Sequence, residues 1–183
     1  MIVPPKAIRD SISNHNHLQS CTESRTLISI QPVTVDELDE LARLYRELAG
    51  TDTPVRKMRK SFKWMQSNPD YIVLGARWKG ILVGSLMGII CHDLVGECRP
   101  FRVLGNVIVS QHYRRRDISN RLMQEIEKIA RKRKWYYILF VSKGEHNEAQ
   151  RFYESLGYRL DAVKGFKKYL SRRSRKTSHR FTQ

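Results

Sequence analysis

Long apolar runs and paired cysteines are absent from this chain of 183 residues. No stretch approaches the roughly 18 consecutive apolar residues of a membrane-spanning helix. The start, MIVPPKAIRD, lacks the apolar core and the small-residue cleavage site of a signal peptide. The three cysteines, Cys21, Cys91 and Cys98, are an odd number without CxxC spacing, which argues against a disulfide framework and a zinc site. We therefore expect a cytoplasmic protein with no membrane span and no bound metal.

Acidic residues are also scarce, with 18 Asp and Glu against 34 Lys and Arg, which gives a net charge of +16. A field of that sign concentrates anions such as nucleic acid, acidic lipid or a phosphate-rich small molecule. The cations cluster at residues 114–116, 128–134 and 164–180. Charge runs of this kind are equally typical of solvated helix faces and tails, so the charge alone does not choose a partner.

The length and the 40% hydrophobic content fit one domain with an ordinary core. Residues 1–25 show no periodicity and are rich in Ser, Asn and His, which predicts a weakly ordered extension. The folded domain is expected over residues 26–170, and residues 171–183 form a basic tail.

Four helices are predicted from apolar spacing and end signals. Thr34 and Glu37 form a capping box for the first helix, which ends at Gly50. A second helix begins at Pro54 and ends before Asn68. The remaining two are expected over 118–130, where apolar residues repeat on one face, and over 147–156, where Gly157 supplies the stop.

Six strands complete the predicted order. They are Thr26–Ile30, the hairpin YIVLGARW and ILVGSLMGII around Lys79-Gly80, FRVLGNVIV, a buried strand Trp135–Val141 and a last region Tyr158–Leu170. This order predicts an α/β fold with a mixed, mostly antiparallel central sheet and helices on both faces. The piece from residue 103 to 141 should be a parallel strand-helix-strand crossover.

A basic turn, HYRRRDIS at residues 112–119, stands where a strand runs into a helix. Unpaired amides at a helix N-terminus, together with the positive end of the helix dipole, form an anion site, and a pyrophosphate would suit it. The three consecutive arginines would add charge-assisted hydrogen bonds, unless the turn is simply flexible and exposed.

The order of elements and two motifs resemble the GNAT superfamily of N-acetyltransferases, over residues 26–170. The family's first motif, Arg/Gln-x-x-Gly-x-Gly/Ala, corresponds to Arg114 through Ser119. The second, Asn-x-x-Ala-x-x-Phe-Tyr-x-x-x-Gly-Tyr/Phe, is matched in full by Asn147, Ala149, Phe152, Tyr153, Gly157 and Tyr158.

This resemblance implies acetyl-CoA as co-substrate, with the Val107 amide at the thioester carbonyl, Val109 along the pantetheine arm and Tyr153 as general acid. Taken without the motif, Tyr153 fits a core tyrosine equally well, and Asn147 could instead cap its helix. The implied cofactor-binding residues are Val107, Ile108, Val109, Arg114, Arg115, Arg116, Asp117, Ile118, Ser119, Asn147, Phe152 and Tyr153.

Asp117 stands where the family's first motif has its glycine, and Ser119 replaces the second small residue. Two outcomes are open for Asp117. Its carboxylate could take the helix amides and repel the anion, or it could point away and leave the amides accessible. Many relatives also carry a glutamate where this chain has Gly105, so no general base is assigned.

Two functions of different classes follow. One is an N-acetyltransferase that transfers an acetyl group to a primary amine, by preference on a small molecule. The alternative is a GNAT-like fold with a degenerate cofactor site that works as a basic binding module, with nucleic acid as a candidate partner of residues 128–134 and the tail. A homodimer is a further option that the sequence leaves open.

Overall fold

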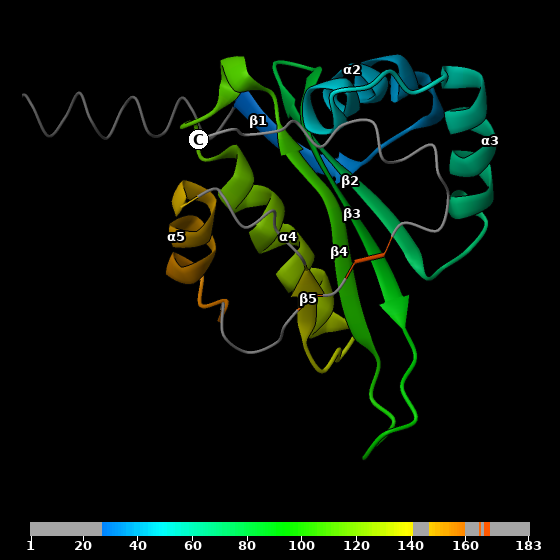
Figure 1. Cartoon of the computed structure of the whole chain (residues 1–183), viewed down its shortest axis with the longest axis vertical. Coiled ribbons are helices and arrows are strands. Elements are labelled where there is room, and N and C mark those ends of the chain that lie inside the picture. Colours follow the sequence, from blue (N-terminus) through cyan, green and yellow to red (C-terminus); the bar gives the residue numbers. More distant parts are fainter. Residues whose placement is uncertain (1–26, 141–146, 160–164, 166, 169–183) are drawn as a thin grey trace, which may run out of the picture. The chain divides into compact units, whose positions relative to one another are not determined.

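The computed structural model describes residues 27–140, 147–159, 165 and 167–168 (Figure 1). They belong to two compact units, residues 1–140 and 141–183, and each unit is described by itself. The predicted extension over 1–25, most of the last strand beyond Arg159, and the tail over 171–183 lie outside the described residues. Within the described part of the chain, no helix combines the length and the apolar character needed to cross a membrane.

The first unit is built on a five-stranded sheet with the order β1-β2-β3-β4-β5. Its strands are β1 (Ile28–Pro32), β2 (Tyr71–Trp78), β3 (Ile81–Cys91), β4 (Phe101–Val109) and β5 (Ile138–Phe140). Neighbouring strands are antiparallel from β1 to β4, whereas β5 is parallel to β4. The predicted mixed and mostly antiparallel sheet is confirmed, and a helix joins the parallel pair as a crossover requires.

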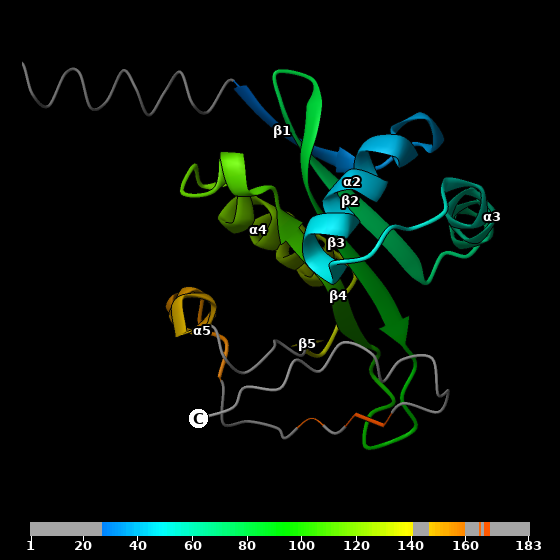
Figure 2. The ribbon, with the colours of Figure 1, turned by 45° about the horizontal axis from the view of Figure 1, so that its top comes forward.

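Helices cover both faces of this sheet, as predicted (Figure 2). They are η1 (Val35–Glu37), α2 (Leu38–Ala49), α3 (Val55–Gln66), η2 (Gln111–Tyr113) and α4 (Ile118–Lys132). On one face, α2 and α3 pack on a core that includes Leu41, Phe62 and Ile108. On the other face, the Ile118 side chain of α4 lies next to the Gly84 backbone. Burial of one side of each helix explains the apolar spacing that predicted it.

Two turns follow the chemistry of their residues. Lys79 and Gly80 have φ angles of 49° and 87°, and this left-handed pair forms the two-residue hairpin turn between β2 and β3. Gly50 also has a left-handed backbone, with φ 71°, and its N–H donates to the Arg46 carbonyl at 2.9 Å to end α2. Both turns were predicted from the sequence.

The predicted strand Trp135–Val141 is shorter than expected, since the ladder with β4 covers only Ile138–Phe140. Val141 lies outside the described residues. The prediction of a buried strand is wrong for Tyr136 and Tyr137, which are 61% and 42% exposed. Each of these two residues makes one backbone hydrogen bond to the segment at the start of β4, from the Tyr136 N–H to the Pro100 carbonyl and from the Arg102 N–H to the Tyr137 carbonyl. The Tyr137 ring also stacks on Phe101, with the ring centroids 4.7 Å apart. Tyr136 and Tyr137 therefore belong to the connection between α4 and β5 and not to the strand.

The second unit contains α5 (Asn147–Ser155), which confirms the fourth predicted helix to within one residue. The helix ends at Gly157, whose φ is 86°. After that turn the Tyr158 N–H donates to the Tyr153 carbonyl at 3.1 Å.

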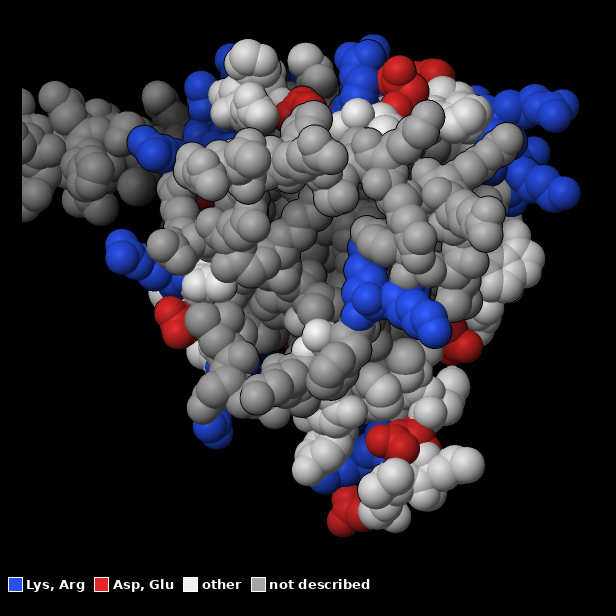
Figure 3. Space-filling view, in the orientation of Figure 1, with Lys and Arg blue, Asp and Glu red and all other residues white. Residues whose placement is uncertain are grey.

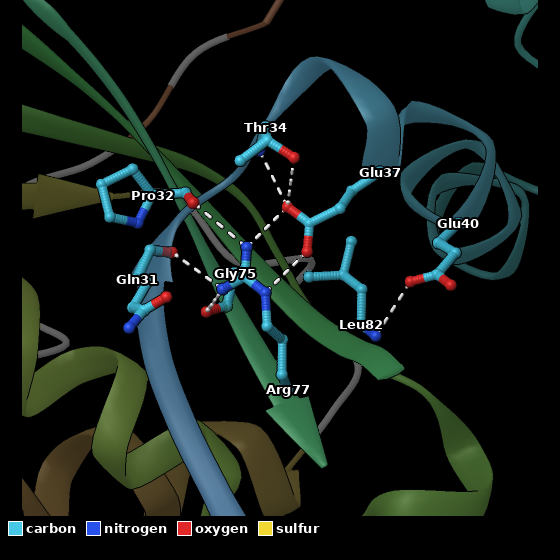
Figure 4. A network of polar contacts seen from close by, with 8 residues as sticks. All are labelled: Gln31, Pro32, Thr34, Glu37, Glu40, Gly75, Arg77 and Leu82. Carbon is cyan, nitrogen blue, oxygen red and sulfur yellow. Dashed lines mark hydrogen bonds and ion pairs between the residues drawn. The ribbon is translucent and has the colours of Figure 1, made fainter. Parts of the chain in front are cut away.

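A polar network ties η1 to the sheet (Figure 4). The Arg77 guanidinium donates two hydrogen bonds to the Glu37 carboxylate, at 2.6 Å from Nε and 2.5 Å from Nη2. It also donates to the carbonyl of Pro32 at 3.1 Å. Glu37 in turn accepts from the Thr34 N–H at 2.8 Å, the contact expected from the capping box. One ion pair thus links η1, β1 and β2.

Substituting Glu37 should change how stability depends on pH. Partial burial would raise the pKa of Glu37, but the hydrogen bonds from Arg77 and Thr34 and the charge of Arg77 lower it below the usual 4.5. Its contribution is therefore complete well above pH 4.5 and is lost as the pH falls through the lower folded pKa. We expect Glu37→Gln to lower the free energy of unfolding by about 2 kcal/mol at neutral pH.

Urea unfolding at a series of pH values measures this effect. The difference between wild type and Glu37→Gln should shrink as the pH falls below 4.5. The exposed Asp36 in the same turn gives the matched control, Asp36→Asn. An equal loss in both variants would contradict the assignment to the Arg77 pair.

Candidate functional site

A β-bulge interrupts the pairing of β4 with β3. Met87 pairs with Gly105 and Ser85 pairs with Ile108, so two residues of β4, Asn106 and Val107, stand opposite the single residue between the pairs on β3. Asn106 has a left-handed backbone, with φ 52°. A bulge leaves one residue outside the ladder and re-aims its backbone groups. A ligand that pairs like a strand can use such groups, and Val107 was predicted to be one of its contacts.

Tyr45 reaches this bulge from α2. Its hydroxyl interacts with the side chains of Ser85 and Asn106, and burial raises its pKa, an effect that these two contacts partly oppose. The contact with Ser85 falls short of a well-formed hydrogen bond, because no described residue lies in bonding geometry with the buried Ser85 Oγ. The bulge is therefore flanked by a phenol that stays protonated at neutral pH.

Glu47 fixes the connection between β4 and α4. Its carboxylate accepts from the Ser110 hydroxyl at 3.0 Å and from the Gln111 N–H at 3.0 Å. Ser110 directly follows the end of β4, at Val109. One side chain of α2 thus holds the backbone that leads from the bulge into the basic turn.

The basic turn has an unusual backbone. Arg115 and Asp117 both have left-handed conformations, with φ angles of 60° and 63°, and α4 begins at Ile118. Asp117 is thus a left-handed residue followed directly by a right-handed helical one, and the successive N–H groups of such a pair form a concave anion site. The first turn of α4 adds the positive end of the helix dipole and contains no acidic residue. The backbone of residues 115–119 therefore suits a phosphate.

Asp117 is the N-cap residue of α4, but its side chain makes no cap hydrogen bond, so the first of the two outcomes, a carboxylate that takes the helix amides, is not found. Its carboxylate accepts from the Asn120 Nδ2 at 2.8 Å and from the Arg121 Nε at 3.4 Å. Arg121 also donates to the Ile28 carbonyl at 3.3 Å, which anchors α4 to β1. The carboxylate is thus held along the side of the helix, and its charge is countered by Arg121.

The three arginines of the turn have different surroundings. The Arg114 Nε lies 3.5 Å from the Val109 carbonyl. The Arg116 guanidinium lies 4.9 Å from the ring of Trp78 and 5.6 Å from that of Tyr113, so it stacks on two aromatic rings. All three side chains are exposed. The turn is therefore strongly basic at its surface, and the aromatic rings stabilise its last arginine.

Replacing Asp117 by glycine should have little effect on binding of acetyl-CoA. The carboxylate is exposed, and an exposed charge held by neighbouring groups changes affinity by about 1 kcal/mol or less, which is about fivefold. Titration calorimetry with acetyl-CoA measures the change, and Asp93→Gly in the β3–β4 loop is a control for loss of a surface acid. A gain of more than about tenfold would mean that Asp117 impairs the site.

Tyr153 and Phe152 lie in α5, in the second unit. Burial raises the pKa of the Tyr153 hydroxyl. The Tyr153 ring has aromatic neighbours on two sides, Phe152 at 5.1 Å and Tyr158 at 6.3 Å between centroids. Asn147 begins α5, and its side chain lies outside the described residues.

The predicted cofactor residues of the first unit thus form one continuous path, from Val107, Ile108 and Val109 through the turn to Ser119. Tyr45, Glu47 and Asn106 were not predicted. Only Asn106 had a signal, as a polar residue inside the apolar run VLGNVIV. Among the described residues, no group of three or more His, Cys, Asp or Glu is placed to hold a metal ion.

Comparison with known proteins agrees with this geometry. The model of the acetyltransferase (GNAT) family matches residues 35–158. No curated protein sequence matches the chain. Solved structures with the same fold are many, and three acetyltransferases are described below.

Glucosamine-6-phosphate N-acetyltransferase from Arabidopsis thaliana is 14% identical with a TM-score of 0.71, over 79% of this chain and 99% of that one. An acetyltransferase of Trypanosoma brucei is 17% identical with a TM-score of 0.68, over 78% and 99%. An aminoglycoside acetyltransferase from an uncultured soil metagenomic sample, solved with sisomicin, is 15% identical with a TM-score of 0.68, over 80% and 99%. At these identities the likeness concerns the fold. The family match covers most of the chain, which therefore belongs to the GNAT family of acetyltransferases, in which acetyl-CoA is the usual donor and amines are the general acceptors.

Proposed function

We propose that the protein is an N-acetyltransferase that transfers the acetyl group of acetyl-CoA to a primary amine by direct attack. The observation that supports this most strongly is the turn before α4. Its backbone is left-handed at Arg115 and Asp117, directly before the N-terminus of α4, which favours an anion there. The carboxylate of Asp117 accepts hydrogen bonds from Asn120 and Arg121 instead of from the helix amides. The binding-module alternative assumed a cofactor site blocked by Asp117, and the contacts of its carboxylate with Asn120 and Arg121 give that assumption no support.

The chemistry of the residues of β4 and of the turn supports acetyl-CoA as the co-substrate. The turn from Arg114 to Ser119 would hold the pyrophosphate through backbone N–H groups and exposed guanidinium groups. The strand from Val107 to Val109 would pair with the amides of the pantetheine arm, because β5 pairs with β4 only at residues 102–104 within the described part of the chain. Bound acetyl-CoA supplies the acetyl group as an activated thioester.

Tyr153 is proposed as the general acid. Direct attack by an amine needs a proton for the departing thiolate, and a phenol can donate it. The raised pKa of Tyr153 keeps its hydroxyl protonated at the pH of the cell. The role of Asn147 is proposed as a hydrogen bond that orients the pantetheine arm, and Phe152 as an apolar contact to it. The amine must arrive neutral, since only its free base attacks.

The acceptor is proposed to be an amine on a small molecule. Two of the structural neighbours are a glucosamine-6-phosphate N-acetyltransferase and an aminoglycoside acetyltransferase, and both of these acceptors contain amino sugars. On the α2 side of the bulge, the Tyr45 hydroxyl and the exposed Asn106 side chain offer neutral hydrogen-bonding groups to such a molecule.

Two measurements test the proposal in order. Titration calorimetry with acetyl-CoA should give micromolar binding, and desulfo-CoA should compete with it. A panel of amino sugars, polyamines and amino acids should then release free thiol from acetyl-CoA in the presence of the protein. Absence of binding at millimolar acetyl-CoA would contradict the proposed function.

A further inference from the structure

Helix α3 carries a strongly basic surface. Five of its 12 residues are cations and none is acidic. We call these cations, together with Trp64, the α3 basic face: Arg56, Lys57, Arg59, Lys60, Lys63 and Trp64. Within the described part of the chain, none of the five cations forms an ion pair, whereas Lys128 and Arg131 of α4 are paired with Glu125 and Glu127. The charge of α3 is therefore not neutralised by its surroundings.

The opposite side of α3 is occupied by the core. Phe62 is buried there, and Val55, Met58 and Met65 pack against the same cluster. The outward side presents Arg56, Lys57, Lys60 and Lys63, which are all exposed. Figure 3 shows blue Lys and Arg side chains projecting at the upper right, on the side where Figure 1 labels α3. Because Phe62 is buried, and Val55, Met58 and Met65 pack on the core, Trp64 alone is exposed among the large apolar side chains of α3, so the helix has no broad apolar face to insert into a lipid bilayer.

Trp64 adds an aromatic surface beside the cations. It is 58% exposed, which is unusual for the largest apolar side chain, and its ring lies edge-on to Tyr71 at 5.2 Å. Lys60 stands four residues before it on the helix, and Lys63 precedes it directly. Exposed aromatic rings among cations suit nucleobases, which stack on the ring while the phosphates meet the cations. A carboxylate-rich peptide would use the cations but not the ring.

We propose that the α3 basic face binds single-stranded nucleic acid. The paired helix α4 and the acidic helix α2 do not offer a comparable surface, since each carries carboxylates among its cations. This binding is independent of acetyl transfer, because no residue of the face belongs to the proposed cofactor site. The net charge of +16 assists by drawing polyanions to the molecule.

Fluorescence anisotropy with a labelled single strand of about 20 nucleotides tests the proposal on the full chain. With four phosphate contacts, affinity should fall about 50-fold between about 50 and 200 mM salt. The double variant K57E/K60E should lose more than about tenfold in affinity. K132E/K134E, which makes the same charge change at the end of α4, is the matched control and should lose much less. Thermal unfolding verifies that both variants are folded.

The contribution of the Trp64 ring to binding of the single strand is tested separately. Trp64→Ala should weaken binding of the single strand about tenfold, and Trp64→Phe should restore most of it, because either ring can stack on a base. Binding to a polyglutamate peptide should be unaffected by Trp64→Ala. Equal losses in K57E/K60E and K132E/K134E would show that only the net charge acts and would overturn the proposal. Tighter binding to polyglutamate than to the single strand would also overturn it, in favour of an acidic protein partner.

Discussion

Replacing Tyr153 by phenylalanine should lower kcat about a hundredfold to ten-thousandfold, which is the usual contribution of a positioned general acid to the rate. The substitution removes one oxygen atom and keeps the ring, so its contacts with Phe152 and Tyr158 persist. Affinity for acetyl-CoA should stay within about twofold in calorimetry, since the hydroxyl acts on the leaving group. The expected signature is a loss of kcat with little change in binding.

The pH dependence separates this role from a structural one. Burial raises the pKa of Tyr153 above the usual 10.0, so its proton is present throughout the neutral and mildly alkaline range. The wild-type rate should therefore rise with pH as the acceptor amine loses its proton, and fall only above pH 10. In Tyr153→Phe the alkaline fall should be absent from the residual rate.

Tyr158→Phe is the matched control, because it makes the same chemical change in a ring 6.3 Å away. It should keep near-normal activity. Equal activity of Tyr153→Phe and wild type would contradict the proposed acid and return Tyr153 to the other role that the sequence allowed, a core tyrosine. If both variants are destabilised to a similar extent, the comparison of their activities still holds, because kcat is calculated per folded molecule.

Local signals explain why most of the fold could be predicted from the sequence. Gly50, the Lys79-Gly80 turn and the apolar spacing of α4 depend on neighbours within a few residues. Such preferences act before any long-range contact forms. The strand around Trp135 was overextended because Trp and Tyr favour strands, whereas the local path is set by hydrogen bonds to Pro100 and Arg102, more than 30 residues earlier in the chain.

The candidate site was predicted only in part, because some of its contacts come from residues far away in the sequence. The turn from Arg114 to Ser119 is local and was found by its charge and its place before a helix. The orientation of the Asp117 carboxylate depends on Asn120 and on Arg121, whose other partner is in β1, and both outcomes were open until those contacts were known. Glu47 accepts a hydrogen bond from Ser110, just after β4, although the two residues are 63 positions apart in the sequence. No local sequence pattern predicts such a contact.

Arg102 is the residue whose replacement should most improve stability. It lies at the start of β4 with none of its surface exposed, and no described residue accepts a hydrogen bond from its Nε, Nη1 or Nη2. Burial, with the repulsion of Arg133, lowers its pKa to about 10. Its guanidinium lies 3.8 Å from the centre of the Trp135 ring, and its side chain fits there because residue 88 is glycine, where a Cβ would come within 2.7 Å of the Arg102 Cδ.

Two effects compete when Arg102 becomes methionine. The cation–π contact with Trp135 is worth about 2 kcal/mol when desolvated, and methionine recovers about 1 kcal/mol of it through contact between sulfur and the ring. Against this, burying a charged group without partners costs several kcal/mol. Desolvation wins, so Arg102→Met should raise the free energy of unfolding by about 1 to 3 kcal/mol.

Urea unfolding at neutral pH measures the gain, and Arg133→Met is the matched control. Arg133 carries the same group near the same ring, at 6.0 Å, but it is exposed, so its replacement should change stability by less than about 0.5 kcal/mol. Arg102→Lys should not be stabilising, because it keeps the buried charge and gives up the planar stack. A loss of stability in Arg102→Met larger than the loss in Arg102→Lys would mean that the guanidinium is held by an anion in solution. The assumption that the Arg102 charge is buried without a partner would then be wrong.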